Sequence, residues 1–228
     1  MVTIIDYEGA FNSTVQFDDG TVVMGIAYQT IVEGTVRNPN MPFVCGIGFE
    51  GQGRHQLSNN GKMTKMTTVW RSIFARCYNT KQRVWNSTYK DSKICKEWEN
   101  FQNFGDWFEE NYIEGFYLDK DILIKGNKIY SPETCCFVPN CINIIFANRR
   151  ERGDYPVGVH KQGNKFVAQL NIFGERKAVG RFDTPEEAFE CYKLNKENYI
   201  KEVADKWQDK ISEKVYKAMR NYQIEITD

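Results

Sequence analysis

Short runs that alternate between apolar and polar residues fill the first 50 positions of the chain. The β-rich segments are Thr3–Tyr7, Ser13–Phe17 and Thr21–Met24, and Asp18-Asp19-Gly20 separates the last two. An Asp-Gly pair between two alternating runs is typical of a hairpin turn. The pattern therefore predicts a small β unit over residues 1–50, similar to an SH3-like half-barrel, and indicates no chemistry for it.

Apolar positions change to a helical spacing after a loop rich in Gly, Asn and Gln over residues 45–66. One apolar stripe follows the spacing i, i+3, i+4 and i+7; its members are Trp70, Ile73, Phe74 and Cys77. We therefore expect a helix from about Thr67. A second helical segment is expected near Lys93–Asn111, with an interruption at Gly105.

The next segment changes from extended to helical patterning within a short stretch. Tyr117–Ile124 is a predicted strand, and a turn joins it to a returning strand at Lys128–Tyr130. Pro139 suits the first turn of a helix, so a short helix is expected over Asn140–Arg149. The predicted order is strand, strand, helix.

Three further strands are expected before a C-terminal helical segment. They lie at Tyr155–Lys161, Lys165–Phe173 and Arg176–Phe182, and residues 183–222 form the helical segment, with a break within so long a run. The predicted fold class is therefore α+β. It comprises the small β unit (1–50), a strand–strand–helix module with preceding helices (60–150), and a three-stranded antiparallel sheet followed by a helix (155–225).

Alternation along the last three strands assigns their two faces. The face expected to pack on the helix carries Val157, Val159, Phe166, Ala168, Leu170 and Val179. The opposite face is expected to carry His160, Val167, Gln169, Asn171 and Arg176, with Lys161 and Lys177 beside it. Apart from Val167, this second set can form hydrogen bonds and is net positive. It suits the major groove of DNA, where Gln and Asn pair with adenine and Arg with guanine.

The net charge is zero, from 30 basic and 30 acidic residues, but the charge is unevenly distributed. The positive segments are 61–100 (+6), 119–150 (+2) and 151–182 (+3), and the negative ones are 1–60 (−4), 101–118 (−4) and 183–228 (−3). Local potential, rather than total charge, attracts a polyanion. The basic middle of the chain is therefore compatible with double-stranded DNA as a partner.

Several classes of protein are excluded by composition. The seven cysteines are an odd number without a secretory signal, which favours reduced thiols over a disulfide framework. His55 and His160 are the only histidines, so histidine-rich catalytic sites are largely excluded. No apolar run approaches the roughly 20 residues of a membrane helix, so we expect a cytoplasmic protein with no membrane partner.

Oxygen ligands for a hard cation lie in the strand–strand–helix module. Asp119 ends a predicted strand and Asn143 lies on the following helix, so their side chains could converge on one ion. Mg²⁺ (or Mn²⁺) keeps several waters and needs only one or two protein ligands. Such a metal stabilises the leaving oxygen of a phosphodiester. No organic cofactor is indicated.

Three motifs of this module, Leu118-Asp119-Lys120, Tyr130–Cys135 and Asn143, resemble the ββα-metal core of phage-type HNH endonucleases. The resemblance extends upstream to Trp70, Arg76–Asn79 and Ile94–Trp98, and covers about residues 60–150. It implies a metal-ligand role for Asp119 and Asn143. It also implies that Lys120 stands at the general-base position and Thr134 at the position of the loop Asn.

Lys120 departs from the family pattern, which has a histidine as the base. A lysine is protonated at neutral pH unless its pKa is strongly depressed, and the neighbouring Asp119 and Asp121 favour the protonated form. Two alternatives follow for the catalytic set Asp119, Lys120 and Asn143. The module is either an active nuclease or a degenerate scaffold, in which Asp119 is a turn acid and Asn143 an exposed helix residue.

The C-terminal module resembles the ethylene-response-factor-type (APETALA-type) DNA-binding domain. The matching motifs span about 40 residues: Gly158-Val159-His160, Lys165–Leu170, Val179–Thr184 and Glu186–Phe189 with Tyr192. The resemblance implies that the three-stranded sheet docks in the major groove. The implied DNA contacts are His160, Gln169, Asn171 and Arg176, flanked by Lys161 and Lys177. Ala178, Asn171 and His160 stand where plant members have Trp, Arg and Arg.

Together these features predict a phage-type DNA-binding protein, with an HNH-like endonuclease that cleaves phosphodiester bonds of duplex DNA with a divalent metal. The alternative is a catalytically degenerate HNH scaffold that regulates DNA or binds a host protein, for instance as an anti-defence inhibitor of a host enzyme. In either case a phage-encoded chain would act in the bacterial host cytoplasm.

Overall fold

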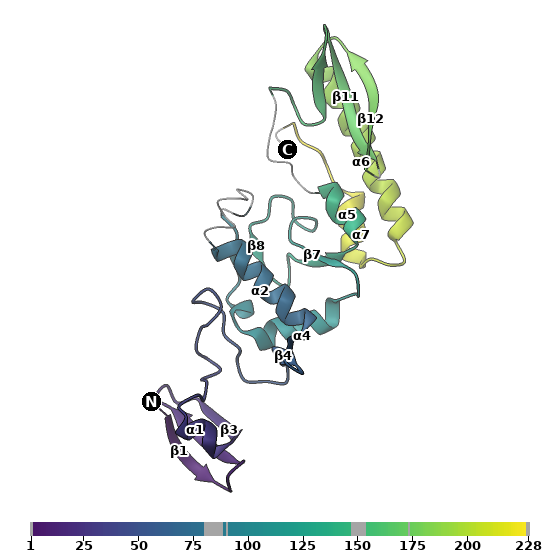
Figure 1. The fold of residues 1–228 in the computed structure, drawn as a ribbon. Coiled ribbons are helices and arrows are strands. Elements are labelled where there is room, and N and C mark those ends of the chain that lie inside the picture. Colours follow the sequence, from purple (N-terminus) through teal and green to yellow (C-terminus); the bar gives the residue numbers. More distant parts are fainter. Residues whose placement is uncertain (1, 80–88, 90, 147–153, 173, 227–228) are drawn as a thin grey trace. The chain divides into compact units, whose positions relative to one another are not determined.

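The computed structural model describes residues 2–79, 89, 91–146, 154–172 and 174–226 (Figure 1). The chain divides into two compact units. The first comprises Met1–Asn79 with Ile94–Phe108, and the second Thr80–Lys93 with Glu109–Asp228. The predicted α+β class is confirmed, since helices alternate with several small sheets and the chain ends in a three-stranded antiparallel sheet followed by a helix. Within the described ranges, no helix is long and apolar enough to cross a membrane.

The first unit begins with the predicted three-stranded sheet. Its strands are β1 (Val2–Tyr7), β2 (Ser13–Phe17) and β3 (Val22–Ile26), antiparallel and in that order, followed by the short helix α1 (Tyr28–Val32). The β2–β3 turn closes with a hydrogen bond from the Gly20 amide to the Phe17 carbonyl (2.9 Å). Gly20 takes a φ of +85°, which a side chain would strain.

A core built mainly from aromatic side chains occupies the rest of this unit. Helix α2 (Lys65–Tyr78) starts at Thr64, whose hydroxyl accepts from the Thr67 amide, and it buries the whole predicted stripe. Helix α4 (Phe101–Asn111) buries Phe101, Phe104, Trp107 and Phe108. The indole of Trp70 donates to the Trp98 carbonyl (2.8 Å) and ties the two regions together. The strands β4 (Ser58–Asn59) and β5 (Lys62–Met63) form a small hairpin in the predicted loop.

The helix expected at Lys93–Asn111 begins later than predicted. The predicted interruption at Gly105 is wrong, because the helix is continuous there. Before it lie the two-residue strand β6 (Lys93–Ile94) and a 3-10 turn, η2 (Glu97–Glu99). Helix α4 then continues through Gly105. A side chain at this position would overlap the ring of His55, so the glycine permits close packing and does not interrupt the helix.

The second unit contains a ββα arrangement, but its strands differ from those predicted. Strand β7 (Tyr117–Asp119) pairs antiparallel with β9 (Cys136–Val138), and helix α5 (Asn140–Phe146) follows. The predicted returning strand at Lys128–Tyr130 overlaps only the two-residue β8 (Ile129–Tyr130). Residues 147–149 of the predicted helix lie outside the described residues.

The C-terminal sheet–helix element has the predicted order. Its strands are β10 (Val159–Gln162), β11 (Lys165–Ile172) and β12 (Glu175–Phe182), followed by α6 (Pro185–Trp207) and α7 (Glu213–Arg220). Thr184 and Glu187 form a reciprocal capping box at the start of α6. The expected break in the helical run falls between α6 and α7. The first strand is shorter than predicted, because the Val159 amide turns back to the Pro156 carbonyl (3.1 Å).

The ββα arrangement and the C-terminal element share one hydrophobic core. From the ββα side it contains Ile122, Cys136, Val138 and Ile142, and from the C-terminal side residues such as Leu170, Phe189, Ile200, Val203 and Met219. The Lys196 ammonium on α6 also donates to the Ile145 carbonyl near the end of α5 (3.1 Å). The second unit is therefore one folding core assembled from both predicted modules.

Candidate functional site

Asp119 ends strand β7 with its carboxylate turned back onto the backbone. Its Oδ1 accepts hydrogen bonds from the amides of Asp121 (2.7 Å) and Ile122 (2.9 Å). These bonds stabilise the turn at the end of the strand, as short acidic side chains commonly do. Burial raises the pKa of Asp119, and the two amide bonds act in the opposite direction.

Lys120 lies in a cage of oxygen atoms and is only 3% exposed. Its Nζ donates to both carboxylate oxygens of Asp121 (2.6 and 2.8 Å) and to the Asn127 carbonyl (2.8 Å). These three contacts account for the three protons of an ammonium group. The Asn127 amide group donates in turn to the Lys120 carbonyl (2.8 Å), and Nζ lies 5.9 Å from the centroid of the Tyr130 ring. Lys120 is thus held as a charged structural group.

Thr134 and Asn143 are the other two residues that the sequence matched to the HNH-like pattern. Thr134, at the position of the loop Asn, donates its hydroxyl to the Ile129 carbonyl (2.6 Å) and so closes a turn. Asn143 is half-buried on α5, which packs beside β7, and its backbone amide donates to the Pro139 carbonyl (3.1 Å). The structure therefore brings the elements that carry Asp119 and Asn143 together, as expected.

Two features of the loop as folded disfavour a divalent cation between Asp119 and Asn143. One oxygen of Asp119 is already committed to two amides, and the adjacent buried ammonium of Lys120 would repel a cation. Among the described residues, no three His, Cys, Asp or Glu side chains form a metal-ligating group. The Mg²⁺ site stays a prediction from the sequence.

The exposed face of the C-terminal sheet carries a row of long polar side chains. Cross-strand pairs place His160, Val167 and Arg181 side by side across the three strands, because His160 lies opposite Val167 and Val167 opposite Arg181. Further along the same face, Gln169 lies opposite Ala178 and Asn171 opposite Arg176. We call His160, Gln169, Asn171, Arg176 and Arg181 the outer row. The four candidate DNA contacts from sequence thus lie on one face, as expected.

Arg181 belongs to the outer row, although the sequence pattern did not predict this. Strict alternation along β12 places it on the helix side, together with Val179. The ladder instead shifts register between Ala168 and Gln169, so that Val179 is an extra residue in β12. This β-bulge turns Arg181 to the outer face and Gly180 toward α6, where a Cβ would lie 3.1 Å from the Cys191 sulfur. A glycine inside a strand is the sequence signal for such a bulge.

Lys161 and Lys177 lie on the other side of the sheet from the outer row. Lys161 pairs across the ladder with Phe166 and Lys177 with Leu170, both on the helix-facing side. The Lys161 ammonium lies 5.9 Å from the centroid of the Phe166 ring, and the Lys177 ammonium lies 3.8 Å from Glu175. Both lysines are exposed and flank the sheet, but they do not belong to its outer face.

The outer row is positively charged, and some of its side chains have no ion pair or hydrogen bond among the described residues. Arg176, Arg181 and His160 are exposed, and neither arginine has an ion pair within the ranges that the structure describes. The nearby carboxylate of Asp183 is paired with Lys165 (2.5 Å). Asn171 is more constrained, since its side-chain oxygen accepts from the Gly174 amide in the β11–β12 turn (2.9 Å). Its amide nitrogen remains the group that could contact a base.

His55 is a buried histidine to which the sequence pattern assigned no role. It is 7% exposed, and its Nε2 lies 2.9 Å from Oδ1 of Asp106, whose pKa this bond lowers. The backbone of His55 is bonded to the Gln102 side chain through both its amide (2.9 Å) and its carbonyl (3.0 Å). These contacts fasten the loop before α2 to helix α4, which is a structural role.

Comparison with protein-family models, with curated proteins and with solved structures gives no match to this chain.

Proposed function

We propose that this protein binds duplex DNA through the outer row of its C-terminal sheet, and that its ββα region is a scaffold which does not cleave the strand. The observation that carries the proposal is the pair of exposed arginines, Arg176 and Arg181, on one sheet face without an ion pair among the described residues. The hydrogen bonds that engage Lys120 and Asp119 favour the degenerate alternative over the active endonuclease.

The chemistry of the outer row suits the edges of bases. An arginine guanidinium can bind guanine through two hydrogen bonds, and a glutamine amide can bind adenine in the same way. Gln169 lies between the two arginines along the sheet, with the small Ala178 opposite it. The major groove admits a β-ribbon, so these side chains could reach base edges together. His160 and the half-committed Asn171 extend the same surface.

The environment of Lys120 supports a role without cleavage. A general base needs a lone pair and must reach the water that it activates. The Lys120 side chain is 3% exposed, and its Nζ donates to three oxygen atoms and so offers no lone pair. Asp119 uses Oδ1 to stabilise the backbone turn. Both side chains are thus engaged in holding the loop.

Binding is tested by titrating labelled duplex DNA at two salt concentrations with wild type, Arg181→Gln and Arg176→Gln. Each substitution should weaken binding by about 1–3 kcal/mol if the arginine contacts a base, or flatten the slope of log K against log salt by about one if it contacts a phosphate. Lys201→Gln is the matched control, since α6 covers the other side of the sheet. Equal affinity of all four proteins would reject the outer row as the interface.

Cleavage is tested separately with supercoiled plasmid and Mg²⁺ or Mn²⁺. Wild type and Asp119→Ala should both leave the plasmid intact. Metal-dependent nicking by wild type that disappears in Asp119→Ala would reinstate the endonuclease. If the protein neither binds nor cleaves duplex DNA, a pull-down for a host protein partner addresses the remaining alternative.

A further inference from the structure

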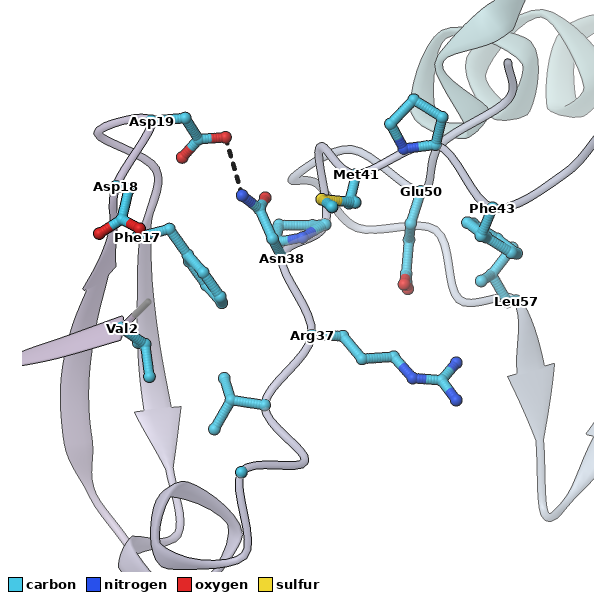
Figure 2. Close-up of a pocket in the computed structure, with 14 residues that line it drawn as sticks. Val2, Phe17, Asp18, Asp19, Arg37, Asn38, Met41, Phe43, Glu50 and Leu57 are labelled. Atoms are coloured by element: carbon cyan, nitrogen blue, oxygen red, sulfur yellow. Dashed lines mark hydrogen bonds between the residues drawn. The ribbon is translucent and has the colours of Figure 1, made fainter. Parts of the chain in front are cut away.

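A hollow of about 780 Å³ lies in the first unit, beside the N-terminal sheet. Figure 2 shows it between that sheet, the connecting segment that carries Arg37 and Asn38, and the segment that carries Phe43 and Glu50. This volume is within the range of pockets that bind small ligands. Neither the outer row nor the ββα loop contributes to it, so it is independent of the proposed DNA interface.

The walls of the pocket are mainly apolar. Val2 and Phe17 face each other across the β1–β2 ladder and form the wall on the sheet side. Met41, Phe43 and Leu57 line the other sides of the pocket, and Met41 and Phe43 are 67% and 46% exposed. Exposed apolar side chains that gather around one hollow are typical of a binding surface.

Hydrogen bonds hold these walls in place. The Asn38 amide group donates to Asp19 (2.8 Å), as the dashed line in Figure 2 marks, and the Asn40 amide group donates to the Thr21 hydroxyl (3.0 Å). The Gln52 amide group donates to the Val22 carbonyl. The connecting segment is therefore attached to the β2–β3 hairpin, and the pocket is preformed.

Two side chains of opposite charge line the pocket and are uncommitted among the described residues. Arg37 and Glu50 both line it, and Figure 2 shows both side chains extending into the space. Within the described part of the chain, neither side chain forms a hydrogen bond or an ion pair. Partial burial raises the pKa of Glu50, and the charge of Arg37 opposes this. A preformed apolar pocket with a few convergent polar groups is the usual form of a ligand site.

We propose that this pocket binds a short apolar peptide with free termini, whose ammonium group pairs with Glu50 and whose carboxylate pairs with Arg37. The guanidinium fork matches a carboxylate through two hydrogen bonds. Apolar side chains of the ligand would cover Phe17, Met41 and Phe43. A ligand with only one charge would pair with only one of Arg37 and Glu50, so the two groups together favour a ligand that carries both charges.

The test compares tri-leucine with free termini against its N-acetylated form and its C-amidated form, using calorimetric titration of the full chain. Each blocked form should bind about fivefold or more weakly than the free peptide, since a charge-assisted hydrogen bond is lost. Glu50→Gln should remove the penalty for N-acetylation only. Arg37→Gln should remove the penalty for C-amidation only.

Two methionine variants check the location of the site without touching its charges. Met41→Ala should weaken all three peptides by a similar factor, and Met24→Ala, an exposed methionine of β3 that does not line the pocket, should change nothing. The proposal is overturned if the free peptide does not bind, if the blocked forms bind equally well, or if Met24→Ala and Met41→Ala have the same effect. DNA affinity plays no part in these readouts, so this test stands apart from that of the proposed function.

Discussion

The ion pair between Lys120 and Asp121 is asymmetric in its exposure to water. The lysine side chain is 3% exposed, whereas that of Asp121 is 39% exposed. Loss of the lysine leaves a carboxylate that can be rehydrated, but loss of the carboxylate leaves an ammonium that water cannot reach. Breaking a buried pair is costly mainly because of the charge that remains buried.

We therefore expect Asp121→Asn to destabilise the protein by about 3–5 kcal/mol and Lys120→Met by less, about 1–3 kcal/mol. Urea unfolding of both variants measures the difference. Lys96→Met is the control, because Lys96 is 93% exposed in its pair with Glu99 and should contribute well under about 1 kcal/mol. If Lys120→Met lowers the free energy of unfolding more than Asp121→Asn does, then the unpaired buried ammonium is not the main cost of breaking this pair.

At the scale of elements, β10 depends on a glycine at its entrance. Gly158 has a φ of +76°, and a Cβ there would overlap the ring of Tyr192 on α6. Its carbonyl accepts from the Gln169 amide (2.7 Å), which aligns β10 with β11. Gly158 and Tyr192 therefore lie against each other where the sheet meets α6. The glycine thus brings sheet and helix close together.

Gly158→Ala should destabilise the second unit by about 2–4 kcal/mol, from left-handed strain together with the overlap with Tyr192. Gly163→Ala is the matched control. Gly163 also has a positive φ (+63°) but has open space around it, so its cost should be only about 1 kcal/mol. Thermal unfolding of the two variants separates strain from packing, and equal losses would contradict the packing role.

At the scale of the whole molecule, the second unit is expected to unfold cooperatively. Ile142 of α5 is fully buried in the core that it shares with Leu170 of the sheet and with α6. The two regions that sequence patterns assign to separate modules therefore depend on the same apolar contacts. Elements that share a core usually open together in hydrogen exchange.

Ile142→Ala should destabilise the second unit by about 2–5 kcal/mol. Native-state hydrogen exchange should show the same loss of protection for the amides of β9 and of β11. By sequence, only β9 belongs to the module that contains Ile142. The exposed Ile144, 59% accessible on the same helix, gives the control variant Ile144→Ala, which should have little effect. Loss of protection confined to β9 and α5 would show two independent cores.

Most elements could be predicted from the sequence because their signals are local. The stripe from Trp70 to Cys77, the turn at Asp18–Gly20 and the cap at Thr184 each depend on residues within a few positions of one another. Hydrophobic periodicity and capping chemistry need no distant partner. The outer-face position of His160, Gln169, Asn171 and Arg176 followed from alternation for the same reason.

What only the tertiary structure decided depends on contacts between distant residues. Strand β7 pairs with β9 and not with the nearer segment at Lys128–Tyr130, because the Asp119 carboxylate turns the backbone and Lys120 is anchored to Asn127. The bulge that exposes Arg181 reflects the close approach of Gly180 to α6. Arg37 and Glu50 meet at one pocket although 13 positions separate them in sequence. Local patterns define which residues can fold and bind, whereas packing between distant segments determines which of them come together, because burial and register are set by the whole core.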